Sequence, residues 1–534
     1  MTDLSASDVI ARRLAEAGCR FAFGIPGGEV LALTDALDRA GIAVVLSRHE
    51  NCAGFMGEGA WHGGAGPAIL FATIGPGVAN AVNVIANAWQ DRVPMIVLTG
   101  CVTAADAHTY THQVFDHVAL LAPVTKAAFR VEPGTAAVVV EKALSIAMEG
   151  RPGPVVLDFP IDVQREVRPA WPVARAVAAA PTAPAGEALA EARTWIAEAK
   201  RPLVIAGLDA VVQGAEGVVA DFCRAHHAPL ITTYKAKGIL PEDDPLSLGA
   251  AGLSPVADAE LLPLVAEADC VILAGYDPIE MRVGWRDPFA PGQRVIEVAA
   301  ASNDHFMHQA SQSFVADIAA GLVALTVGGG ATWPPDLADG VRTRLRAAYS
   351  AEAPWGPAAI VDAAEAALPA ETVVTVDSGA HRIVFSQVWR ARAPRSVLQS
   401  SGLCTMGAAV PLAIGRKLAE PDRPVVAFVG DAGVEMFLGE LATARDHRLS
   451  LPVVVFIDVQ LALIELKQRG AQMPEVGVTF GATDFPAVAE ALGGAGIWVE
   501  TREALAEALQ AALARDTFSL IAARIGRRDY DGRI

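Results

Sequence analysis

Two short hydrophobic runs near the C-terminus constrain the fold of this chain more than any other feature. Residues 424–428 and 452–457 are continuous, apolar and rich in β-branched side chains, which is typical of parallel strands buried on both faces. Residues 440–448 between them have the pattern of a helix, so the segment is a strand–helix–strand unit. Asp431 and Asp458 follow the two strands, and ligands of such sheets bind beyond the carboxyl ends of the strands.

The turn Val429-Gly430-Asp431-Ala432-Gly433 has two interpretations. Gly430 and Gly433 allow close backbone approach to a ligand and leave N–H groups free for a phosphate. Two carboxylates beside such a turn suit a hard divalent cation that bridges to a diphosphate. An ordinary polar turn with two solvated aspartates explains the same residues equally well.

The alternation of strands and helices extends over most of the 534 residues, a length that predicts about three domains. We therefore expect an α/β fold with three doubly wound parallel-sheet domains, of which the first and third are variations on one architecture. Two Pro- and Ala-rich stretches predict linkers. The expected domains are residues 1–168, 188–330 and 356–534, and the expected linkers are 169–187 and 331–355.

Composition excludes several classes of function. The formal net charge is −18, which argues against a nucleic-acid partner or an anionic membrane surface. The six cysteines are scattered without a Cys-x-x-Cys pair, a pattern that fits reduced thiols better than disulfides or a zinc site. The first residues lack the basic and apolar regions of a signal peptide, and no apolar stretch is long enough to span a bilayer. We expect a cytoplasmic protein.

The chain resembles, over almost its full length, the thiamine-diphosphate-dependent 2-oxo-acid enzymes, the family of acetolactate synthases and 2-oxo-acid decarboxylases. Gly430-Asp431-Ala432 followed by Asp458 is similar to that family's Gly-Asp-Gly followed by Asn or Asp, with Ala432 as a departure. The resemblance implies a pyrimidine-binding, a middle and a diphosphate-binding domain. It also implies that Asp431, Asp458 and the main-chain carbonyl of Gln460 hold Mg²⁺.

Three further motifs carry the resemblance. Glu50 lies in an Arg-His-Glu context, which implies a catalytic glutamate that hydrogen-bonds N1′ of the cofactor's aminopyrimidine. Cys404-Thr405-Met406-Gly407 resembles Gly-Thr-Met-Gly, in which the methionine wedges between the cofactor's two rings and bends it. Residues 378–381 resemble the loop that meets the diphosphate. Read alone, Glu50 is a surface or helix N-terminal carboxylate and Met406 a core methionine.

The resemblance thus implies a set of cofactor-binding residues from the first and third domains. They are Ile25, Pro26, Gly27, Glu50, Gly75, Ser378, Gly379, Ala380, His381, Cys404, Met406, Gly430, Asp431, Ala432, Gly433, Asp458, Gln460, Leu461, Ala462 and Leu463.

The substrate side is defined by two segments. Residues 73–77 resemble a loop beside the reacting centre, and residues 112–116 resemble the acetolactate synthase segment whose glutamine, here Gln113, helps to seat the substrate. Residues 276–280 look like the FAD-free acetolactate synthases, so FAD is possible but not favoured.

The resemblance favours a carboligase that decarboxylates a 2-oxo acid such as pyruvate and forms a C–C bond, as acetolactate synthases do. The alternatives are a 2-oxo-acid decarboxylase, a lyase of 2-hydroxy ketones or 2-hydroxyacyl thioesters, and a catalytically silent thiamine diphosphate-binding protein. The resemblance further implies a homodimer or a dimer of dimers, with active sites between chains.

Overall fold

A computed structural model describes residues 3–172, 175–279 and 281–534 of the chain. Residues 1–2 of the expected first domain and residues 173–174 of the expected first linker lie outside the described residues. Glu280, at the end of the segment that resembles FAD-free enzymes, also lies outside them.

The first domain contains a six-stranded parallel sheet of order β3-β2-β4-β5-β7-β6. Its central strands are mostly apolar, as expected where helices cover both faces of a sheet, and all residues of β5 and β7 are buried. The strands are β2 (Phe21–Ile25), β3 (Ala43–Leu46), β4 (Ala68–Ala72), β5 (Met95–Cys101), β6 (Ala127–Arg130) and β7 (Pro154–Pro160). The helices are α1 (Ala6–Glu16), α2 (Leu31–Arg39), α3 (Glu50–His62), α4 (Pro76–Gln90), α5 (His117–Leu121), α6 (Ala136–Met148) and α7 (Ile161–Gln164), and β1 (Leu4–Ser5) pairs with β8 (Val167–Arg168).

The third domain repeats this architecture, with a parallel sheet of order β16-β15-β17-β18-β20-β19. When the strands of each six-stranded sheet are numbered along the chain, the two sheets have the same order. This confirms the prediction that the first and third domains are variations on one architecture. The strands are β15 (Val373–Val376), β16 (Val397–Gln399), β17 (Val425–Gly430), β18 (Leu451–Ile457), β19 (Ala495–Val499) and β20 (Phe518–Arg524). The helices are α14 (Pro357–Ala367), α15 (Ala380–Val388), α16 (Ala409–Ala419), α17 (Asp431–Met436), α18 (Glu440–Asp446), α19 (Ala462–Gly470), α20 (Phe485–Ala491) and α21 (Arg502–Leu513).

The middle domain has a different parallel order, β11-β10-β9-β12-β13-β14. The three sheets together confirm the predicted α/β fold with three doubly wound domains. The strands are β9 (Pro202–Ala206), β10 (Leu230–Thr233), β11 (Ser247–Ala251), β12 (Cys270–Ala274), β13 (Arg294–Ala299) and β14 (Gln312–Val315). The helices are α8 (Glu187–Glu198), α9 (Leu208–Val212), α10 (Glu216–His226), α11 (Pro255–Glu267) and α12 (Ile318–Leu325), and α13 (Leu337–Ala348) follows them.

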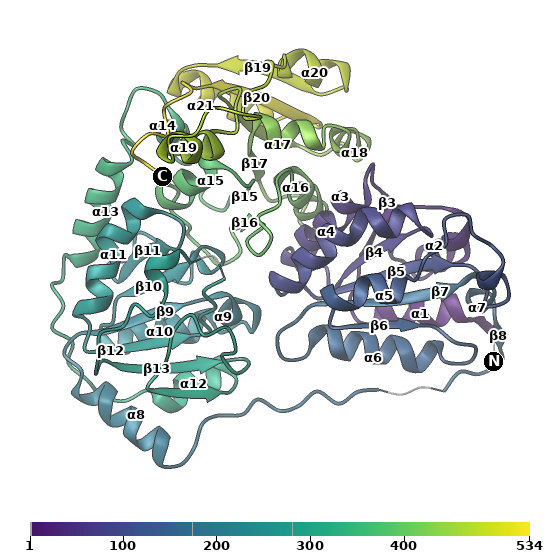
Figure 1. Cartoon of the computed structure of the whole chain (residues 1–534), viewed down its shortest axis with the longest axis horizontal. Coiled ribbons are helices and arrows are strands. Elements are labelled where there is room, and N and C mark those ends of the chain that lie inside the picture. Colours follow the sequence, from purple (N-terminus) through teal and green to yellow (C-terminus); the bar gives the residue numbers. More distant parts are fainter. Residues whose placement is uncertain (1–2, 173–174, 280) are drawn as a thin grey trace.

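The connections between the domains differ in character. Residues 175–186 run as a long irregular strap that leads into α8 of the middle domain (Figure 1). Helix α13 lies inside residues 331–355, the expected second linker, so this stretch contains regular structure. Its amphipathic pattern buries Ala338, Val341 and Leu345, which explains why it is helical.

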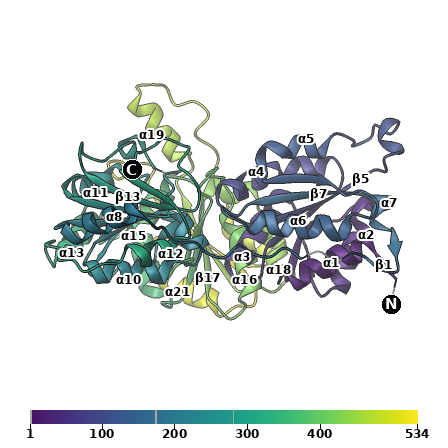
Figure 2. The same cartoon turned by 90° about the horizontal axis from the view of Figure 1, so that it is seen from below.

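Helix α3 joins the first domain to the third, because it packs directly on α16 (Figures 1 and 2). The two backbones approach so closely that a Cβ at Gly59 would collide with the carbonyl oxygen of Leu412, and one at Gly415 with that of Met56. Glycine is therefore required at both positions. This contact places Glu50, the first residue of α3, beside the third domain.

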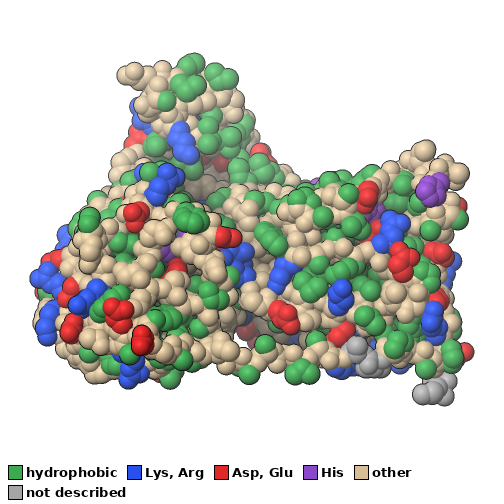
Figure 3. All heavy atoms as spheres, turned by 60° about the horizontal axis from the view of Figure 1, so that its bottom comes forward, with side chains coloured by type: hydrophobic (Ala, Val, Ile, Leu, Met, Phe, Trp, Pro, Cys, Tyr) green, Lys and Arg blue, Asp and Glu red, His purple; other side chains and the backbone are tan. Residues whose placement is uncertain are grey.

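The charged side chains and the cysteines are distributed without a pattern that points to one kind of site on the face shown in Figure 3 or among the described thiols. On the face shown in Figure 3, basic and acidic side chains are interspersed among hydrophobic and other polar groups. Among the described residues, no helix combines the length and the apolar character that crossing a membrane requires. The six cysteines all lie among the described residues and form no disulfide; five are buried and Cys404 is exposed.

Candidate functional site

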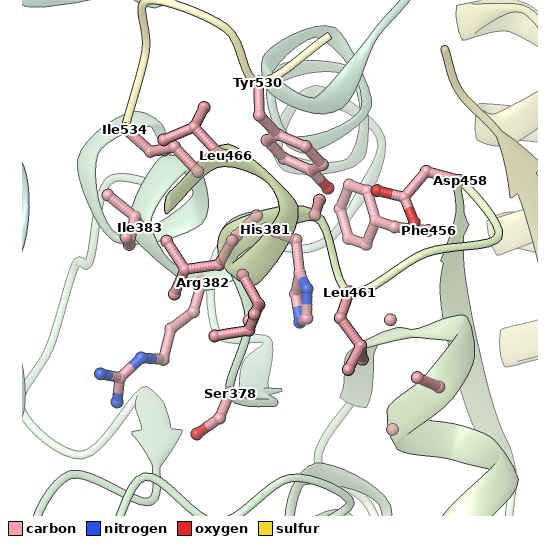
Figure 4. A pocket seen from close by; sticks show the side chains of 18 of the residues that line it. Ser378, His381, Arg382, Ile383, Phe456, Asp458, Leu461, Leu466, Tyr530 and Ile534 are labelled. Carbon is pink, nitrogen blue, oxygen red and sulfur yellow. The ribbon is translucent and has the colours of Figure 1, made fainter. Parts of the chain in front are cut away.

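A cavity of about 640 Å³ lies at the carboxyl ends of the third-domain strands. Third-domain residues form most of its wall, and the middle domain contributes Leu253, Pro255 and Arg282. The predicted residues that line it are Ser378, Gly379, Ala380, His381, Cys404, Met406, Gly430, Asp431, Ala432, Gly433, Asp458, Gln460, Leu461, Ala462 and Leu463. In Figure 4, the aliphatic side chains of Ile383, Leu466 and Ile534 gather on one side, whereas Asp458 lies on the other.

Asp431 and Asp458 form a buried carboxylate pair at this cavity. Asp431 begins α17, and its Oδ2 atom accepts hydrogen bonds from the backbone N–H groups of Asp458 (3.2 Å) and Val459 (2.7 Å). Burial raises the pKa of Asp431. Burial, together with the charge of Asp431, raises the pKa of Asp458 to about 7. A divalent cation would offset the repulsion and the burial of both carboxylates, so this donor set fits Mg²⁺.

The backbone between the two carboxylate segments is strained. Val459 has a φ of +58°, a left-handed conformation that is unfavourable for a β-branched residue. This turn directs the N–H groups of Asp458 and Val459 at the same carboxylate oxygen of Asp431. The valine at this position gives no signal of such a conformation in the sequence, since Gly or Asn is the usual residue there.

The wall beside the carboxylate pair offers polar atoms that the chain itself does not satisfy. The ring of His381 stacks on Phe456 with a centroid separation of 5.3 Å. Burial and the neighbouring Arg382 lower the pKa of His381 to about 3, so the ring is neutral. In the described part of the chain, His381 Nε2 and Ser378 Oγ are buried without a hydrogen-bond partner. A polar ligand in the cavity would give both atoms the hydrogen-bond partner that they lack.

Asp377 organises the loops around the cavity and was missed by the motif comparison. Its carboxylate accepts hydrogen bonds from the backbone N–H groups of Gly407 (2.8 Å) and Ala408 (2.9 Å). Burial raises its pKa to about 6. A Cβ at Gly433 would collide with Asp377 Oδ2. The turn after β15, the loop that carries Met406 and helix α17 thus meet at one carboxylate, whose only signal in the sequence is its place after a strand.

The two departures from the family motifs have different structural consequences. Cys404 has a φ of +51°, a conformation that explains why glycine is usual there. Its Sγ donates to the carbonyl oxygen of Ser401 (3.1 Å) and lies 3.3 Å from Arg382 Nη2. Ala432 lies within helix α17 and is not among the residues of positive φ, so alanine fits there without backbone strain.

The chain after Asp458 forms the far wall. The backbone N–H of Leu461 donates to the carbonyl oxygen of Val478 (2.8 Å), and the Gln460 side chain donates to the carbonyl of Arg527. Tyr530 is buried, and its ring lies beside Phe456 in the cavity (Figure 4). Burial and the charges of the two aspartates raise its pKa. Tyr530 belongs to no recognised motif, so it was not among the predicted site residues.

The predicted first-domain residues form a second group. Glu50 is 5% exposed, and one of its carboxylate oxygens accepts a hydrogen bond from Asn80 Nδ2 (3.0 Å). A Cβ at Gly77 would lie 3.1 Å from Glu50 Oε1 and 3.3 Å from the methyl group of Thr73. Asn80 is a partner of Glu50 that the motifs did not reveal.

The turn after β2 and the loop after β4 belong to the same group. A Cβ at Gly27, next to Ile25 and Pro26, would collide with the Thr73 side chain, which donates to Glu29 Oε2 (2.8 Å). Residues 25–27 and the loop of Thr73 and Gly75 therefore lie side by side.

Gly75 and Gln113 are also in contact. A Cβ at Gly75 would lie 2.6 Å from the carbonyl oxygen of Gln113. The N–H of Gly75 donates to His117 Nε2 (3.3 Å), and Asp158 accepts from His117 Nδ1 (2.9 Å). Gln113 itself is exposed with a φ of +61°. The structure thus unites Glu50, Gly75, Gln113 and residues 25–27 at one edge of the first sheet.

The cavity residues of the third domain and the first-domain residues around Glu50 form two separate groups within one chain. None of the described residues that line the cavity belongs to the first domain. One chain therefore carries a cavity with a carboxylate pair, and, on another domain, a buried glutamate among loops at strand ends.

Three family models match consecutive parts of the chain. They are described as Thiamine pyrophosphate enzyme, N-terminal TPP binding domain (residues 4–120), central domain (residues 189–325) and C-terminal TPP binding domain (residues 377–523). Thiamine pyrophosphate and thiamine diphosphate are the same compound.

Curated relatives match over most of their length. Acetolactate synthase isozyme 1 large subunit of Escherichia coli is 33% identical over 474 residues, which are 86% of this chain and 83% of that protein. The "probable 2-ketoarginine decarboxylase" of Pseudomonas aeruginosa is 32% identical, with 92% of this chain and 88% of that protein covered. Acetolactate synthase of Bacillus subtilis is 31% identical, with 94% and 90% covered.

Proposed function

Because this chain belongs to the thiamine-diphosphate-dependent enzymes of the acetolactate synthase type, we propose that it is a carboligase acting on 2-oxo acids. It would decarboxylate pyruvate and join the remaining two-carbon unit to a second carbonyl group. The observation that carries the proposal is the cavity in which the buried pair Asp431 and Asp458 adjoins the unsatisfied polar atoms of Ser378 and His381. These groups suit a diphosphate held through a metal ion.

We propose that the third domain holds the cofactor. Thiamine diphosphate, when bound, supplies a nucleophilic carbon and an electron sink for the loss of CO₂. Asp431, Asp458 and the carbonyl of Gln460 would hold Mg²⁺, and the residues of the two loops at 378–381 and 430–433 would surround the diphosphate. Met406 would support the bent shape of the cofactor.

The first domain would supply the groups that act on the reacting end. Glu50 would hold a proton at the aminopyrimidine ring, with Asn80 orienting its carboxylate. Gln113 would contact the substrate, and the loop of Gly75 would shield the reacting centre from water. Because the described cavity has no first-domain residue in its wall, we propose that Glu50 of the partner subunit completes it. The protein would then be a homodimer or a dimer of dimers with active sites between chains.

A product assay tests the activity. Purified protein with thiamine diphosphate, Mg²⁺ and pyruvate should release CO₂ and form a product that yields acetoin after acidification. Removal of Mg²⁺ with EDTA should abolish the reaction, and added Mg²⁺ should restore it. Acetaldehyde as the only product would contradict the carboligase proposal.

A mixing experiment tests the shared active site. Glu50→Gln and Asp431→Asn each remove one half of a site, so each homodimer should be inactive. Subunit exchange between them creates heterodimers with one intact site, and about one quarter of the wild-type activity should return at equal amounts. If both halves of each site came from one chain, no activity would return.

A second candidate function is simple decarboxylation, which the similarity to a protein named as a probable 2-ketoarginine decarboxylase favours. Among the described residues around the cavity, Arg282, Arg382 and Lys467 are basic, and the acidic side chains are those of Asp431 and Asp458, which a bound Mg²⁺ would neutralise. A cationic side chain such as a guanidinium would be repelled there, so we rank decarboxylation of 2-ketoarginine below carboligation. The identity of the product from each 2-oxo acid decides between them.

We also propose that the middle domain works without FAD. Dinucleotides bind such sheets at the topological switch point, which here lies between β9 and β12. A Cβ at Gly207 would lie only 2.6 Å from the carbonyl oxygen of Gly275 and 2.8 Å from the N atom of Asp277, so the crevice is tightly packed. The start of α9 carries the buried Asp209, paired with Arg151 at 2.9 Å, where a phosphate would need space. A flavin absorption band in the purified protein would contradict this proposal.

The remaining assignments follow the same line. We propose that the pyrimidine-binding, middle and diphosphate-binding domains span residues 1–168, 188–330 and 356–534, joined by linkers 169–187 and 331–355. We also propose a cytoplasmic location without nucleic-acid or membrane partners, which the net charge of −18 supports.

A further inference from the structure

A buried cluster of two carboxylates and one lysine lies where the three domains meet. Glu58 comes from α3, Asp91 follows the last residue of α4, and Lys235 belongs to a short 3-10 helix of the middle domain. Lys235 Nζ lies 2.9 Å from Asp91 Oδ2 and 3.4 Å from Glu58 Oε1. Glu58 is 0% and Asp91 1% exposed. The motifs do not include any of these residues.

Asp91 holds the loop that carries Cys404 and Met406. Its Oδ2 accepts from the N–H of Ser401 (3.0 Å) and its Oδ1 from the N–H of Gly402 (2.8 Å). A Cβ at Gly402 would lie 2.8 Å from the side-chain oxygen of Gln90 and collide with its Cβ. The base of this third-domain loop therefore rests directly on the end of a first-domain helix.

A second chain of hydrogen bonds runs from Glu58 to the same loop. Glu58 Oε2 accepts from Asn87 Nδ2 (3.1 Å), and Asn87 Oδ1 accepts from Ser400 Oγ (2.6 Å). Ser400 Oγ in turn accepts from the N–H of Thr405 (2.9 Å), the residue before Met406. Both carboxylates of the cluster thus act on the loop, one at its base and one near its tip.

Lys235 supplies the positive charge that balances the buried carboxylates of Glu58 and Asp91. Two buried carboxylates face a single ammonium group, and burial raises the pKa of Glu58 against the opposing effect of Lys235. A buried charge that loses its partner is strongly unfavourable, so removal of Lys235 should destabilise this cluster.

We propose that Asp91, held by Lys235 and Glu58, is a positioning residue that fixes the loop of Cys404 and Met406 against the bound cofactor. The inference rests on the proposed function, since it concerns the loop that would bend thiamine diphosphate. It adds that the docking of the first and middle domains on the third sets the geometry at the cofactor. Small misplacements of reacting groups are costly, so a loosened loop affects reactivity more than binding.

Asp91→Asn tests the inference, because asparagine keeps the size but can accept from only one of the two N–H groups. We expect exchange of the C2 proton of bound thiamine diphosphate, followed by NMR after acid quenching, to slow about tenfold or more. The dissociation constant of thiamine diphosphate, measured by calorimetry, should change less than about threefold. Wild-type exchange in Asp91→Asn would overturn the inference.

Asp269→Asn, at an exposed position, is the control for the hydrogen-bond pattern. Asp269 accepts from two consecutive backbone N–H groups, those of Lys200 (2.7 Å) and Arg201 (2.9 Å), but lies in the middle domain away from the cavity. Its exchange rate should equal that of the wild type. An equal slowing in both variants would reduce the role of Asp91 to general structural support and overturn the inference.

A pair of lysine variants keeps the test independent of stability. Lys235→Met and Lys237→Met each remove a buried ammonium at a domain junction, and Lys237 pairs with Glu242 (2.7 Å) without touching the loop. Both should lower the melting temperature, but only Lys235→Met should slow C2 exchange, and Lys235→Arg should restore part of the rate. Equal exchange rates in the two methionine variants would overturn the inference. A wild-type protein that binds no thiamine diphosphate would overturn the proposed function, and this inference with it.

Discussion

The first and third domains share one strand order and carry different groups at the same edge of the sheet. In the third domain, the ends of β15, β17 and β18 carry the carboxylates Asp377, Asp431 and Asp458, all buried. In the first domain, the corresponding edge carries one deeply buried glutamate, Glu50, among loops that contribute a threonine and glycines.

This difference has a direct electrostatic consequence. Burial raises the pKa of Asp431 and of Asp458, and the charge of Asp431 raises the pKa of Asp458 further, so the third-domain edge favours a cation. Glu50 has a neutral partner, Asn80, and is available to a neutral or basic ring. Topology thus decides where ligands gather, and the side chains at the strand ends decide which ligands they are.

Asp431→Asn should have the largest effect, because it should weaken the proposed cofactor binding by the third domain. It removes the negative charge of a proposed metal ligand and leaves one oxygen where the carboxylate had two, so the affinity for Mg²⁺ and thiamine diphosphate should fall more than about 100-fold. Calorimetric titration measures it. Asp446→Asn, a surface change in the same domain, is the control, and tight binding by Asp431→Asn would remove this residue from the metal site.

Glu50→Gln should leave the binding of thiamine diphosphate intact and remove the proposed proton-sharing role of the first domain. Proton exchange at C2 of the bound cofactor should slow about 100-fold, because the amide cannot take part in proton sharing with the ring. The dissociation constant of thiamine diphosphate serves as the internal control. If binding is lost while the exchange rate of the residual complex is normal, the division of labour between the two domains is wrong.

Gly433→Ala should destabilise the third domain by about 1–3 kcal/mol, since the added methyl group collides with the Asp377 carboxylate. Gly77→Ala, whose Cβ meets Glu50 Oε1 at 3.1 Å, is the first-domain counterpart and should cost less. Chemical denaturation compares the two. A larger loss in Gly77→Ala would show that the first-domain edge is the more tightly packed of the two.

Val459→Asn should have the smallest effect and a stabilising sign. Asparagine tolerates the left-handed conformation at φ +58°, so the unfolding free energy should rise by about 1 kcal/mol. Val476→Asn, at an exposed position without positive φ, controls for the change of side chain. A loss of stability in Val459→Asn, measured by denaturant unfolding, would mean that the valine side chain contributes packing that exceeds its backbone strain.

Much of the fold could be predicted from the chain alone, for a physical reason. Strands buried on both faces must be continuously apolar, so β17 and β18 are visible in the sequence almost to the residue. Carboxylates directly after such strands can only lie at one edge of a parallel sheet, which is why Asp431 and Asp458 were found without any contact information. Helix α13 was assigned to a linker because the prolines before it dominate the local pattern.

The sequence by itself determined the three α/β domains and the carboxylate pair, because local patterns and strand-end positions encode them, and the resemblance of its motifs to a known family indicated the cofactor class. Only the tertiary structure revealed Asp377 as the meeting point of three segments, the strain at Val459, and the cluster of Glu58, Asp91 and Lys235. Each of these depends on residues far apart in the chain or on a backbone angle that the residue type disfavours. Contacts between domains leave no periodic pattern in a single sequence, so folding alone brings them together.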